Sequence, residues 1–395
     1  MMKRWVATVL GVLTAAGTAG AAGPVRRVAE PVRDEYIVVL KAGAAGGGRG
    51  FTGGPRVASV ASDVARLHGA LVERVFEHAL HGFSARMTAR RAAALAADPR
   101  VDYVEEDGIV RLVTSEPAAA WGIDRIDQRA LPLDETYSYT HTGSGVTAYI
   151  IDTGIRFDHT EFGGRATSGF DAVNGGSADD CNGHGTHVAG TVGGATYGVA
   201  KQVSLVAVRV LNCLGAGSNA KVIDGIDWVT EHHVSPAVAN VSLGSTSTSD
   251  SLDAAVRNSI NSGVSYVLAA GNGNLLGIAQ DACTTSPARV TEAMTVSATN
   301  ENDNKPFWAN YGDCVDWFAP GVGIKSAWKS SATATATLSG TSMAAPHTAG
   351  VAALYLEVNP GATPAQVRDA LFANATPDIV GRARTVNNHL LFTDY

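Results

Sequence analysis

The sequence is short of three things: cysteine, charge and long apolar runs. Its 395 residues include four cysteines and no C-x-x-C pair, which argues against a zinc site. Charged residues make up 17%, the net charge is −7, and no cluster of Lys or Arg stands out, so a nucleic-acid partner is excluded. Beyond the N-terminus no segment approaches the roughly 20 apolar residues of a membrane span, so no membrane partner is expected.

Apolar residues and glycine are plentiful instead. Apolar residues make up 45% of the chain, and there are 44 glycines. This composition suits a compact α/β enzyme whose buried elements are joined by tight turns. The length exceeds that of a small domain, so we expect one large domain and an additional part.

The first residues have the pattern of a secretory signal peptide. Lys3 and Arg4 precede an apolar stretch at 5–16, and small residues follow at 19–21. A membrane anchor is the alternative, but Gly and Thr dilute the stretch, which is also shorter than a span. We therefore expect residues 1–21 to be removed and the protein to be secreted and extracellular.

An exported chain with an even number of cysteines is expected to form disulfides. The four are Cys181, Cys213, Cys283 and Cys314. They allow three pairings, and their spacing alone does not choose among them.

Residues 34–113 are predicted to form a small domain. Apolar periodicity and turn residues predict the order β-α-β-β-α-β, which is typical of a ferredoxin-like module. The expected elements are a strand at 36–40, a helix at 57–68, two strands within 71–87, a helix at 88–97 capped by Thr88, and a strand at 101–104. A small, polar stretch at 113–120 is predicted to be a linker.

From Trp121 onward, apolar strands alternate with longer helical segments. Strands are expected at 146–151, 205–211, 238–243 and 264–269, with helices at 219–232 and 252–262. Continuous Val, Ile and Leu strands separated by helices indicate a parallel sheet that is buried on both faces. The predicted fold is therefore α/β, with a mostly parallel central sheet between two layers of helices, preceded by the small α+β domain.

Three residues of this larger region have side chains suited to nucleophilic catalysis. Asp152 follows a predicted strand, at the carboxyl end where catalytic groups gather in parallel sheets. His184 lies between two glycines before a small-residue helix, whose N-terminus favours the neutral imidazole of a general base. Ser342 is predicted at the N-terminus of a helix that reaches Val358, where backbone N–H groups favour negative charge.

Each of these residues also has an ordinary structural explanation. Asp152 alone could be a turn residue, and Ser342 alone a helix cap. Asn272, which follows another strand, is either a turn residue or an amide donor to an oxyanion. His184 and His187 could bind a metal, but the Glu beside the first His of zinc-peptidase helices is missing. A metal-dependent hydrolase is kept as an alternative.

Taken together, the segments around these residues resemble the subtilisin-like serine proteases, and among them the proteinase K and aqualysin group. The similarity is carried by residues 149–154, 182–190, 242–244, 269–272 and 340–346, and by the order Asp, His, Ser along the chain. It extends over essentially all of residues 121–391, and residues 35–112 resemble the inhibitor-type propeptide of the same family.

The resemblance implies a secreted serine endopeptidase that works through an acyl-enzyme and needs no catalytic cofactor. It assigns Ser342 as nucleophile, His184 as general base and acid, and Asp152 as the group that orients the imidazole. Asn272 and the backbone N–H of Ser342 would form the oxyanion hole. The other alternative is a catalytically inactive relative that acts as a binding protein.

Protein or peptide substrate is expected to add as a β-strand between two segments of the chain. The residues concerned are Gly215, Ala216 and Gly217 on one side, Ser242, Leu243 and Gly244 on the other, and Ala269, Ala270 and Gly271 around the pocket for the residue before the cut. Small side chains around that pocket imply broad specificity with a preference for large apolar or aromatic residues.

The resemblance also implies two disulfides and one or two structural calcium ions. The pairs would be Cys181–Cys213 and Cys283–Cys314. One calcium site would use Asp316 with the backbone oxygens of Thr291 and Ala293, and a second Asp124, Asp127, Gln128 and Asp134. An acidic surface loop is the alternative for the second group.

A precursor of three parts follows. We expect a signal peptide at 1–21, a propeptide at 22–114 that chaperones and inhibits, and a monomeric peptidase domain at 115–395. The propeptide tail at 107–114 would lie in the active site, with self-cleavage within 113–119. The chain departs from the family at Ser245 and Gly273, where Gly and Asp are usual, and at Thr136, which weakens the second calcium site. None of these departures removes a catalytic group.

Overall fold

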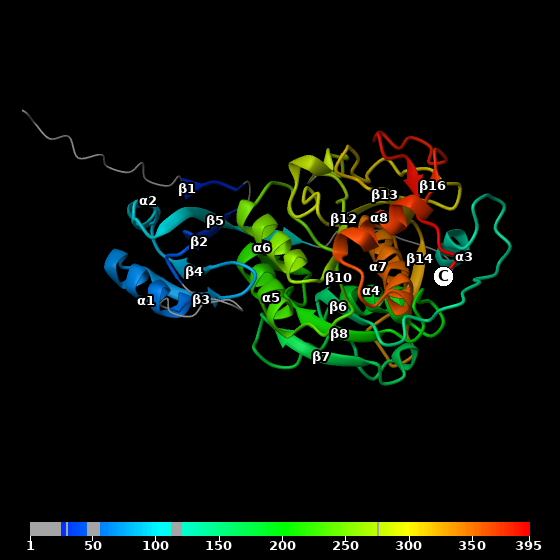
Figure 1. The fold of residues 1–395 in the computed structure, drawn as a ribbon, viewed down its shortest axis with the longest axis horizontal. Coiled ribbons are helices and arrows are strands. Elements are labelled where there is room, and N and C mark those ends of the chain that lie inside the picture. Colours follow the sequence, from blue (N-terminus) through cyan, green and yellow to red (C-terminus); the bar gives the residue numbers. More distant parts are fainter. Residues whose placement is uncertain (1–24, 29–30, 46–55, 112–120, 275) are drawn as a thin grey trace, which may run out of the picture.

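The computed structural model describes residues 25–28, 31–45, 56–111, 121–274 and 276–395. A small N-terminal domain lies beside a larger one (Figure 1). The predicted signal peptide and the predicted cleavage segment at 113–119 fall outside the described residues.

From β2 onward the small domain has the predicted ferredoxin-like order, and the short strand β1, which was not predicted, precedes it. Its elements are β1 (Val25–Arg26), β2 (Pro31–Leu40), α1 (Val57–His68), β3 (Leu71–Phe76), β4 (Gly82–Arg86), α2 (Ala89–Leu95) and β5 (Val101–Arg111). The sheet order is β1-β5-β2-β4-β3. Helix α1 ends at Gly69, whose φ of 67° is a left-handed conformation that glycine adopts readily. The expected cap of α2 is wrong in one respect: Thr88 is the N-cap residue, but its side chain makes no cap hydrogen bond.

The large domain is built on one sheet whose neighbouring strands are parallel, except for the antiparallel pair of β16 and β17 at one edge. In spatial order the strands are β16 (Thr376–Pro377), β17 (His389–Leu390), β13 (Trp317–Pro320), β12 (Met294–Thr299), β11 (Ser265–Ala269), β10 (Ala237–Val241), β6 (Thr147–Asp152), β8 (Ser204–Arg209) and β7 (Ala166–Asp171). The predicted α/β class is confirmed.

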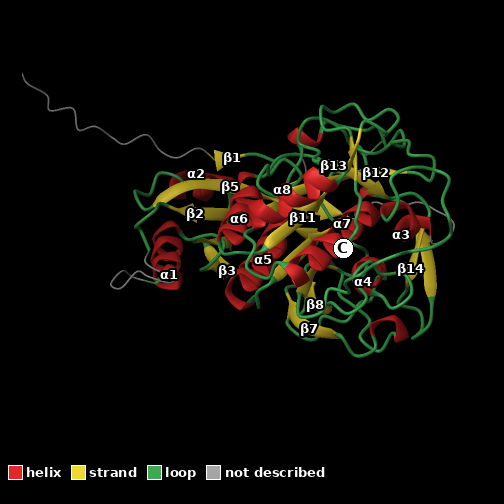
Figure 2. Ribbon diagram, turned by 45° about the vertical axis from the view of Figure 1, so that its right-hand side comes forward, coloured by secondary structure: helices red, strands yellow, loops and turns green. Residues whose placement is uncertain are grey.

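Helices cover both faces of this sheet (Figure 2). The helices of the large domain are α3 (Trp121–Ile126), α4 (His184–Gly193), α5 (Asn219–His232), α6 (Asp250–Asn261), α7 (Thr341–Val358) and α8 (Pro364–Asn374). Side chains of strand β6 point alternately to the two faces of the sheet. Ala148 and Ile150 pack in the apolar core with α4 and α7, whereas Tyr149 and Ile151 pack in the core with α5 and α6. Among the described helices, none is long and apolar enough to cross a membrane.

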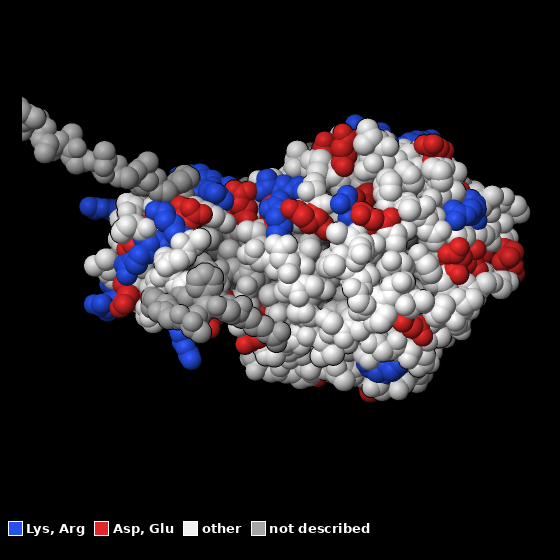
Figure 3. All heavy atoms as spheres, in the orientation of Figure 1, with Lys and Arg blue, Asp and Glu red and all other residues white. Residues whose placement is uncertain are grey.

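Shorter elements complete the large domain. They are the strand β9 (Ala216–Ser218), the hairpin of β14 (Ile324–Ala327) and β15 (Thr335–Leu338), and 3₁₀ turns at Thr160–Phe162 and Ala282–Thr284. Over the face drawn in Figure 3, charged side chains are sparse on the large domain and denser on the small one.

The small domain packs on the layer formed by α5 and α6 (Figures 1 and 2). Ile37, Phe76 and Tyr103 of the small domain belong to the same buried apolar cluster as the inner faces of these helices. Burial of apolar surface therefore holds the two domains together, and the last strand of the small domain, β5, runs towards the carboxyl edge of the central sheet.

Candidate active site

Asp152 and His184 form a buried hydrogen-bonded pair. Asp152 is the last residue of β6, and His184 is the first residue of α4. The Nδ1 atom of His184 lies 2.8 Å and 2.9 Å from the two carboxylate oxygens of Asp152. An Nδ1–H bound to a carboxylate leaves Nε2 as the basic atom of the ring. This Nε2 is buried and has no hydrogen-bond partner among the described residues.

A glycine sets where α4 begins. Gly183 is the N-cap residue, and its φ of 118° lies in the region that side chains disfavour. A Cβ at this position would come within 2.5 Å of the Trp328 ring. A side chain at this position would therefore displace the start of the helix and, with it, His184.

Ser342 is the second residue of α7, as expected for a serine at a helix N-terminus. Its Oγ donates to the backbone oxygen of Ser242 at 3.0 Å. Among the described contacts, no hydrogen bond joins this hydroxyl to His184, so Ser342 has to turn away from Ser242 before its proton can reach Nε2.

Contacts of Ser242 show that Ser342 lies at the same end of the sheet as Asp152. Strands β6 and β10 are neighbours, with Ile151 opposite Val241, so Asp152 and Ser242 follow at the same end of the sheet. The Oγ of Ser242 donates to the backbone oxygen of Ser342 at 2.9 Å and accepts from Asn240 Nδ2 at 2.8 Å. The three predicted catalytic residues therefore lie at one edge of the sheet.

Asn272 lies in the loop after β11 and is tied to the start of α7. Its Oδ1 accepts from the backbone N–H of Thr341 at 2.8 Å, which turns the Nδ2 end of the amide away from that helix bond. Gly271 N donates to Thr341 Oγ1 at 3.0 Å. Both contacts fix the loop against the first turn of the helix that carries Ser342.

A hollow beside Ser342 brings many of the predicted substrate residues together. It is lined by Leu243, Gly244, Ser245, Thr246, Ala269, Ala270, Gly271, Asn272, Gly273, Thr285, Ser286, Ala288, Asn310, Thr341 and Ser342. Sequence reasoning missed Thr285, Ser286, Ala288 and Asn310, because they come from chain segments that carry no motif. Ser242 is fully buried beneath the hollow rather than part of its wall.

The other predicted substrate edge is paired with the small domain. Strand β9 runs antiparallel to the end of β5, with Ile109 opposite Ser218, Val110 opposite Gly217 and Arg111 opposite Ala216. Gly215 precedes β9 in the turn closed by its N–H to Asn212 O. The segment of β9 thus already accepts an extended strand by backbone pairing.

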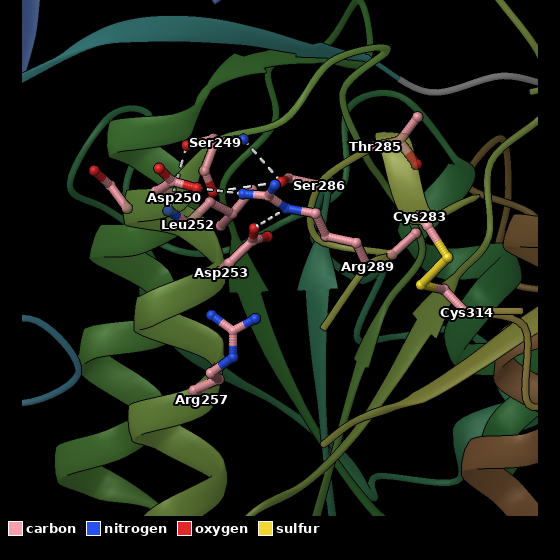
Figure 4. A network of polar contacts seen from close by, with 12 residues as sticks. Ser249, Asp250, Leu252, Asp253, Arg257, Cys283, Thr285, Ser286, Arg289 and Cys314 are labelled. Atoms are coloured by element: carbon pink, nitrogen blue, oxygen red, sulfur yellow. Dashed lines mark hydrogen bonds and ion pairs between the residues drawn. A yellow bond between two sulfur atoms is a disulfide. The ribbon is translucent and has the colours of Figure 1, made fainter. Parts of the chain in front are cut away.

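Acidic residues of β5 bind the starts of two helices. Asp107 accepts from Ala220 N at 2.9 Å at the start of α5, and Glu105 accepts from Ser249 Oγ and Ser251 N at the start of α6. Backbone N–H groups at a helix N-terminus favour such anionic partners. Figure 4 shows that Arg289 also contacts the first turn of α6, where it binds Asp250 and Asp253.

Sequence reasoning also missed Asp180, four residues before His184. Its Oδ1 accepts from Thr153 Oγ1 at 2.9 Å and from the N–H groups of Asn182 and Gly183, and its Oδ2 accepts from Thr186 N and Oγ1. This carboxylate therefore ties the residue after Asp152 to the first turn of α4. The only sequence signal for Asp180 was its position four residues before His184, and an isolated Asp in a loop does not by itself indicate a role.

The other histidines of this region are engaged in the core. His187 Nε2 lies 2.9 Å from Ile324 O, and His347 Nδ1 lies 2.8 Å from Met343 O. Burial lowers the pKa of His187 to about 3 and that of His347 to about 4, so both are neutral at ordinary pH. Asp152 engages one ring nitrogen of His184 and Ile324 engages one ring nitrogen of His187.

The two predicted calcium groups differ in the structure. Asp124 Oδ1 and Asp127 Oδ1 are buried without hydrogen-bond partners, whereas Asp316 is bound by Arg368 and by Thr295 N. Gln128 donates to Ala130 O and Pro132 O, and Asp134 accepts from Thr136 N. Within the described ranges, no three His, Cys, Asp or Glu side chains converge to hold a metal by themselves.

Two disulfides are formed. Cys181–Cys213 joins the loop before His184 to the loop before β9, and Cys283–Cys314 joins the segment beside the hollow to the loop before β13. Both therefore brace loops that border the candidate site, and they leave no free cysteine among the described residues.

Comparisons with known proteins find relatives over most of the chain. The model of the Subtilase family matches residues 143–391, and the model of the Peptidase inhibitor I9 family matches residues 35–113. An extracellular serine proteinase of a Thermus species is 56% identical over 331 residues, which span 83% of this chain and 79% of that protein. A cuticle-degrading serine protease of Arthrobotrys oligospora is 40% identical and covers 95% of both chains. The crystal structure of a cold adapted subtilisin-like serine proteinase has 53% sequence identity and a TM-score of 0.67, covering 70% of this chain and 98% of that one.

Proposed function

This chain belongs to the subtilase family and is an extracellular serine endopeptidase of the subtilisin type, and we propose that Asp152, His184 and Ser342 form its catalytic triad. The observation that carries the proposal is the buried Asp152–His184 hydrogen bond. It leaves the Nε2 atom available as a base at the sheet edge where Ser342 also lies.

The proposed reaction is acyl transfer through the serine. The Ser342 Oγ attacks the carbonyl carbon of the scissile peptide bond while Nε2 of His184 takes its proton, and Asp152 stabilises the imidazolium. The oxyanion is held by the amide of Asn272 and the backbone N–H of Ser342. His184 then protonates the leaving amine, and water hydrolyses the acyl-enzyme through the same groups.

A serine-directed phosphonate tests this assignment. We expect one label per chain, attached to Ser342, and no loss of activity at once when a chelator is added. Failure to label a folded, mature chain would favour the inactive binding protein. Immediate inactivation by chelator, restored by metal, would favour the metal-dependent hydrolase.

The N-terminal region is an inhibitor I9 domain, which supports inhibition of the enzyme by its own propeptide. We propose the boundaries 1–21 for the signal peptide, 22–114 for the propeptide and 115–395 for the peptidase domain, with self-cleavage within 113–119. The antiparallel pairing of β5 with β9 supports this, because the chain leaves β5 at the edge that substrate is proposed to use.

Substrates are proteins, and we propose broad specificity with a preference for large apolar or aromatic residues before the cut. Ala269, Ala270 and Gly271 in the wall of the hollow support this, since small side chains leave room for large ones. A cleavage profile on a peptide library is the direct test, and a preference for charged residues at that position would contradict the proposal.

The propeptide should bind the peptidase domain less tightly as the pH rises towards neutrality. Burial raises the pKa of Asp107 to about 7 in the complex, and its Oδ2 has no hydrogen-bond partner among the described residues. In the separated propeptide the carboxyl has an ordinary pKa near 4. The complex therefore holds the proton more tightly, its extra stability is complete below pH 4, and it is lost as the pH rises through about 7.

The inhibition constant of added propeptide against the mature enzyme measures this effect. We expect inhibition about 10²-fold tighter at pH 5 than at pH 8. Asp107→Asn keeps the hydrogen bond to Ala220 N and cannot ionise, so it should flatten this dependence. An unchanged pH dependence in the Asn variant would show that another group is responsible.

We also propose a structural calcium ion at Asp124 and Asp127, with oxygens of Gln128 and Asp134 as further candidates. Both unpartnered carboxylate oxygens support it, because calcium takes six to eight oxygen ligands. Burial raises the pKa of Asp127, and the neighbouring Asp124 raises it further. A cation here would relieve that cost and clamp the loop after α3, without a part in the chemistry.

Removing calcium should lower stability and spare initial activity. When the free calcium concentration is about 100 times the dissociation constant of the site, binding adds about 2.7 kcal/mol to the free energy of unfolding. Chelation should then lower Tm by roughly 5–10 °C. Differential scanning calorimetry with and without chelator measures it. In Asp127→Asn the chelator should have little further effect, and a full effect in that variant would place the ion elsewhere.

A further inference from the structure

Asp316 is a buried carboxylate at the start of β13, and the sheet fixes its position. Its backbone N–H donates to Thr295 O at 2.9 Å, and its Oδ2 accepts from Thr295 N at 2.7 Å. Only 7% of the side chain is exposed. A carboxylate charge that is buried to this extent requires a cation or hydrogen-bond donors as partners.

That partner comes from α8. The Nε and Nη2 atoms of Arg368 lie 3.0 Å and 2.7 Å from Asp316 Oδ1. The helix that carries Arg368 begins with a capping box formed by Thr363 and Gln366, and Val367 and Leu371 bury its inner face. The guanidinium therefore reaches Asp316 from a helix that is fixed independently of the ion pair.

Asp316 differs from Asp124 and Asp127 in the partners of its buried carboxylate oxygens. At those residues one oxygen of each carboxylate lacks a hydrogen-bond partner among the described residues. At Asp316 both oxygens already accept from protein donors, and one of the donors carries a full positive charge. A calcium ion would have to lie about 2.3–2.6 Å from the same oxygen, where the guanidinium would repel it.

We propose that Arg368 takes the place of a calcium ion at Asp316, so that an internal cation joins α8 to the β12–β13 edge of the sheet. Thr291 and Ala293, in the turn before β12, then need not act as ligands. An internal cation is present at any calcium concentration, so this part of the enzyme keeps its stability in calcium-poor surroundings, unlike the loop at Asp127.

Calcium stoichiometry tests the proposal. The full chain carrying Ser342→Ala is used, so that self-digestion cannot interfere, and bound calcium per chain is measured by equilibrium dialysis. We expect Asp316→Asn to bind as many ions as its parent and to lose several degrees of Tm equally with and without calcium. Arg368→Gln should bind one more ion and regain Tm as calcium is added.

Three controls separate this effect from a general loss of charge. Arg368→Lys keeps a cation and should bind no extra calcium. The double variant Arg368→Gln with Asp316→Asn should return to the parent stoichiometry. Arg257→Gln breaks another ion pair, Arg257–Glu292, at 3.1 Å on the surface and should leave the stoichiometry unchanged.

Two results would overturn the proposal. One is loss of a bound ion in Asp316→Asn, which would mean that calcium occupies the site in the presence of Arg368. The other is no additional ion in Arg368→Gln, provided that the variant is folded by circular dichroism, because the position would then not be a displaced metal site.

Discussion

Ser342→Ala should reduce peptidase turnover by about 10⁶-fold, a magnitude known for the nucleophile of subtilisin, a member of this family, rather than derived from the present geometry. The alanine removes the only atom that is proposed to bond to the substrate carbonyl. His184 and Asp152 then have no hydroxyl to activate, and what remains is binding and oxyanion stabilisation.

Turnover of a peptide substrate and the N-terminal sequence of the secreted chain measure this together. The variant should also accumulate as an uncleaved precursor, since self-cleavage uses the same nucleophile. Ser339→Ala is a matched control, because its hydroxyl accepts from Gly323 N at 2.8 Å in the segment leading to α7. Processing of the Ser342→Ala variant to the mature length would refute self-cleavage.

Asp227→Ala should weaken propeptide binding by about 10²–10³-fold. Asp227, on α5, accepts from three successive backbone N–H groups of the small domain, those of Glu77, His78 and Ala79, at 3.1 Å, 2.8 Å and 2.6 Å. Hydrogen bonds to a charged acceptor contribute about 1.5–3 kcal/mol each. Even with partial hydration of the freed groups, a loss of about 3–4 kcal/mol is expected.

The rate at which cleaved propeptide leaves the enzyme measures this loss, followed as the appearance of activity. Glu231→Gln is the matched control on the same helix, because its ion pair with His78 is half exposed and should matter less than about fivefold. Asp227→Asn keeps one acceptor and should fall between the two. Equal release rates for Asp227→Ala and Glu231→Gln would contradict the prediction.

Local signals predicted much of the secondary structure. The helices at 57–68 and 219–232 have the bounds expected from apolar periodicity, because the end of each coincides with a change in local pattern. Strand β5 was underestimated: the prediction stopped at Val104, whereas the strand runs to Arg111. Its acidic residues 105–107 are poor strand formers alone, and the partners of Glu105 and Asp107 are helix starts more than 100 residues away.

Motifs predicted the residues that gather at the sheet edge, but not the contacts that support them. Asp180 acts through hydrogen bonds to a loop and a helix turn, which have no sequence pattern of their own. Arg368 is 52 residues from Asp316, and nothing in a helical arginine indicates which carboxylate it meets. The direction of the Ser342 hydroxyl is likewise a matter of three-dimensional packing.

The pairing of β5 with β9 has a consequence for the enzyme once it is mature. While the propeptide is bound, the backbone groups of residues 216–218 are satisfied by residues 109–111. When the propeptide leaves, β9 becomes an unpaired edge strand, which can pair with any extended chain, including a loop of another copy that has come loose. Autolysis should therefore be bimolecular, so a concentrated preparation loses activity faster than a dilute one.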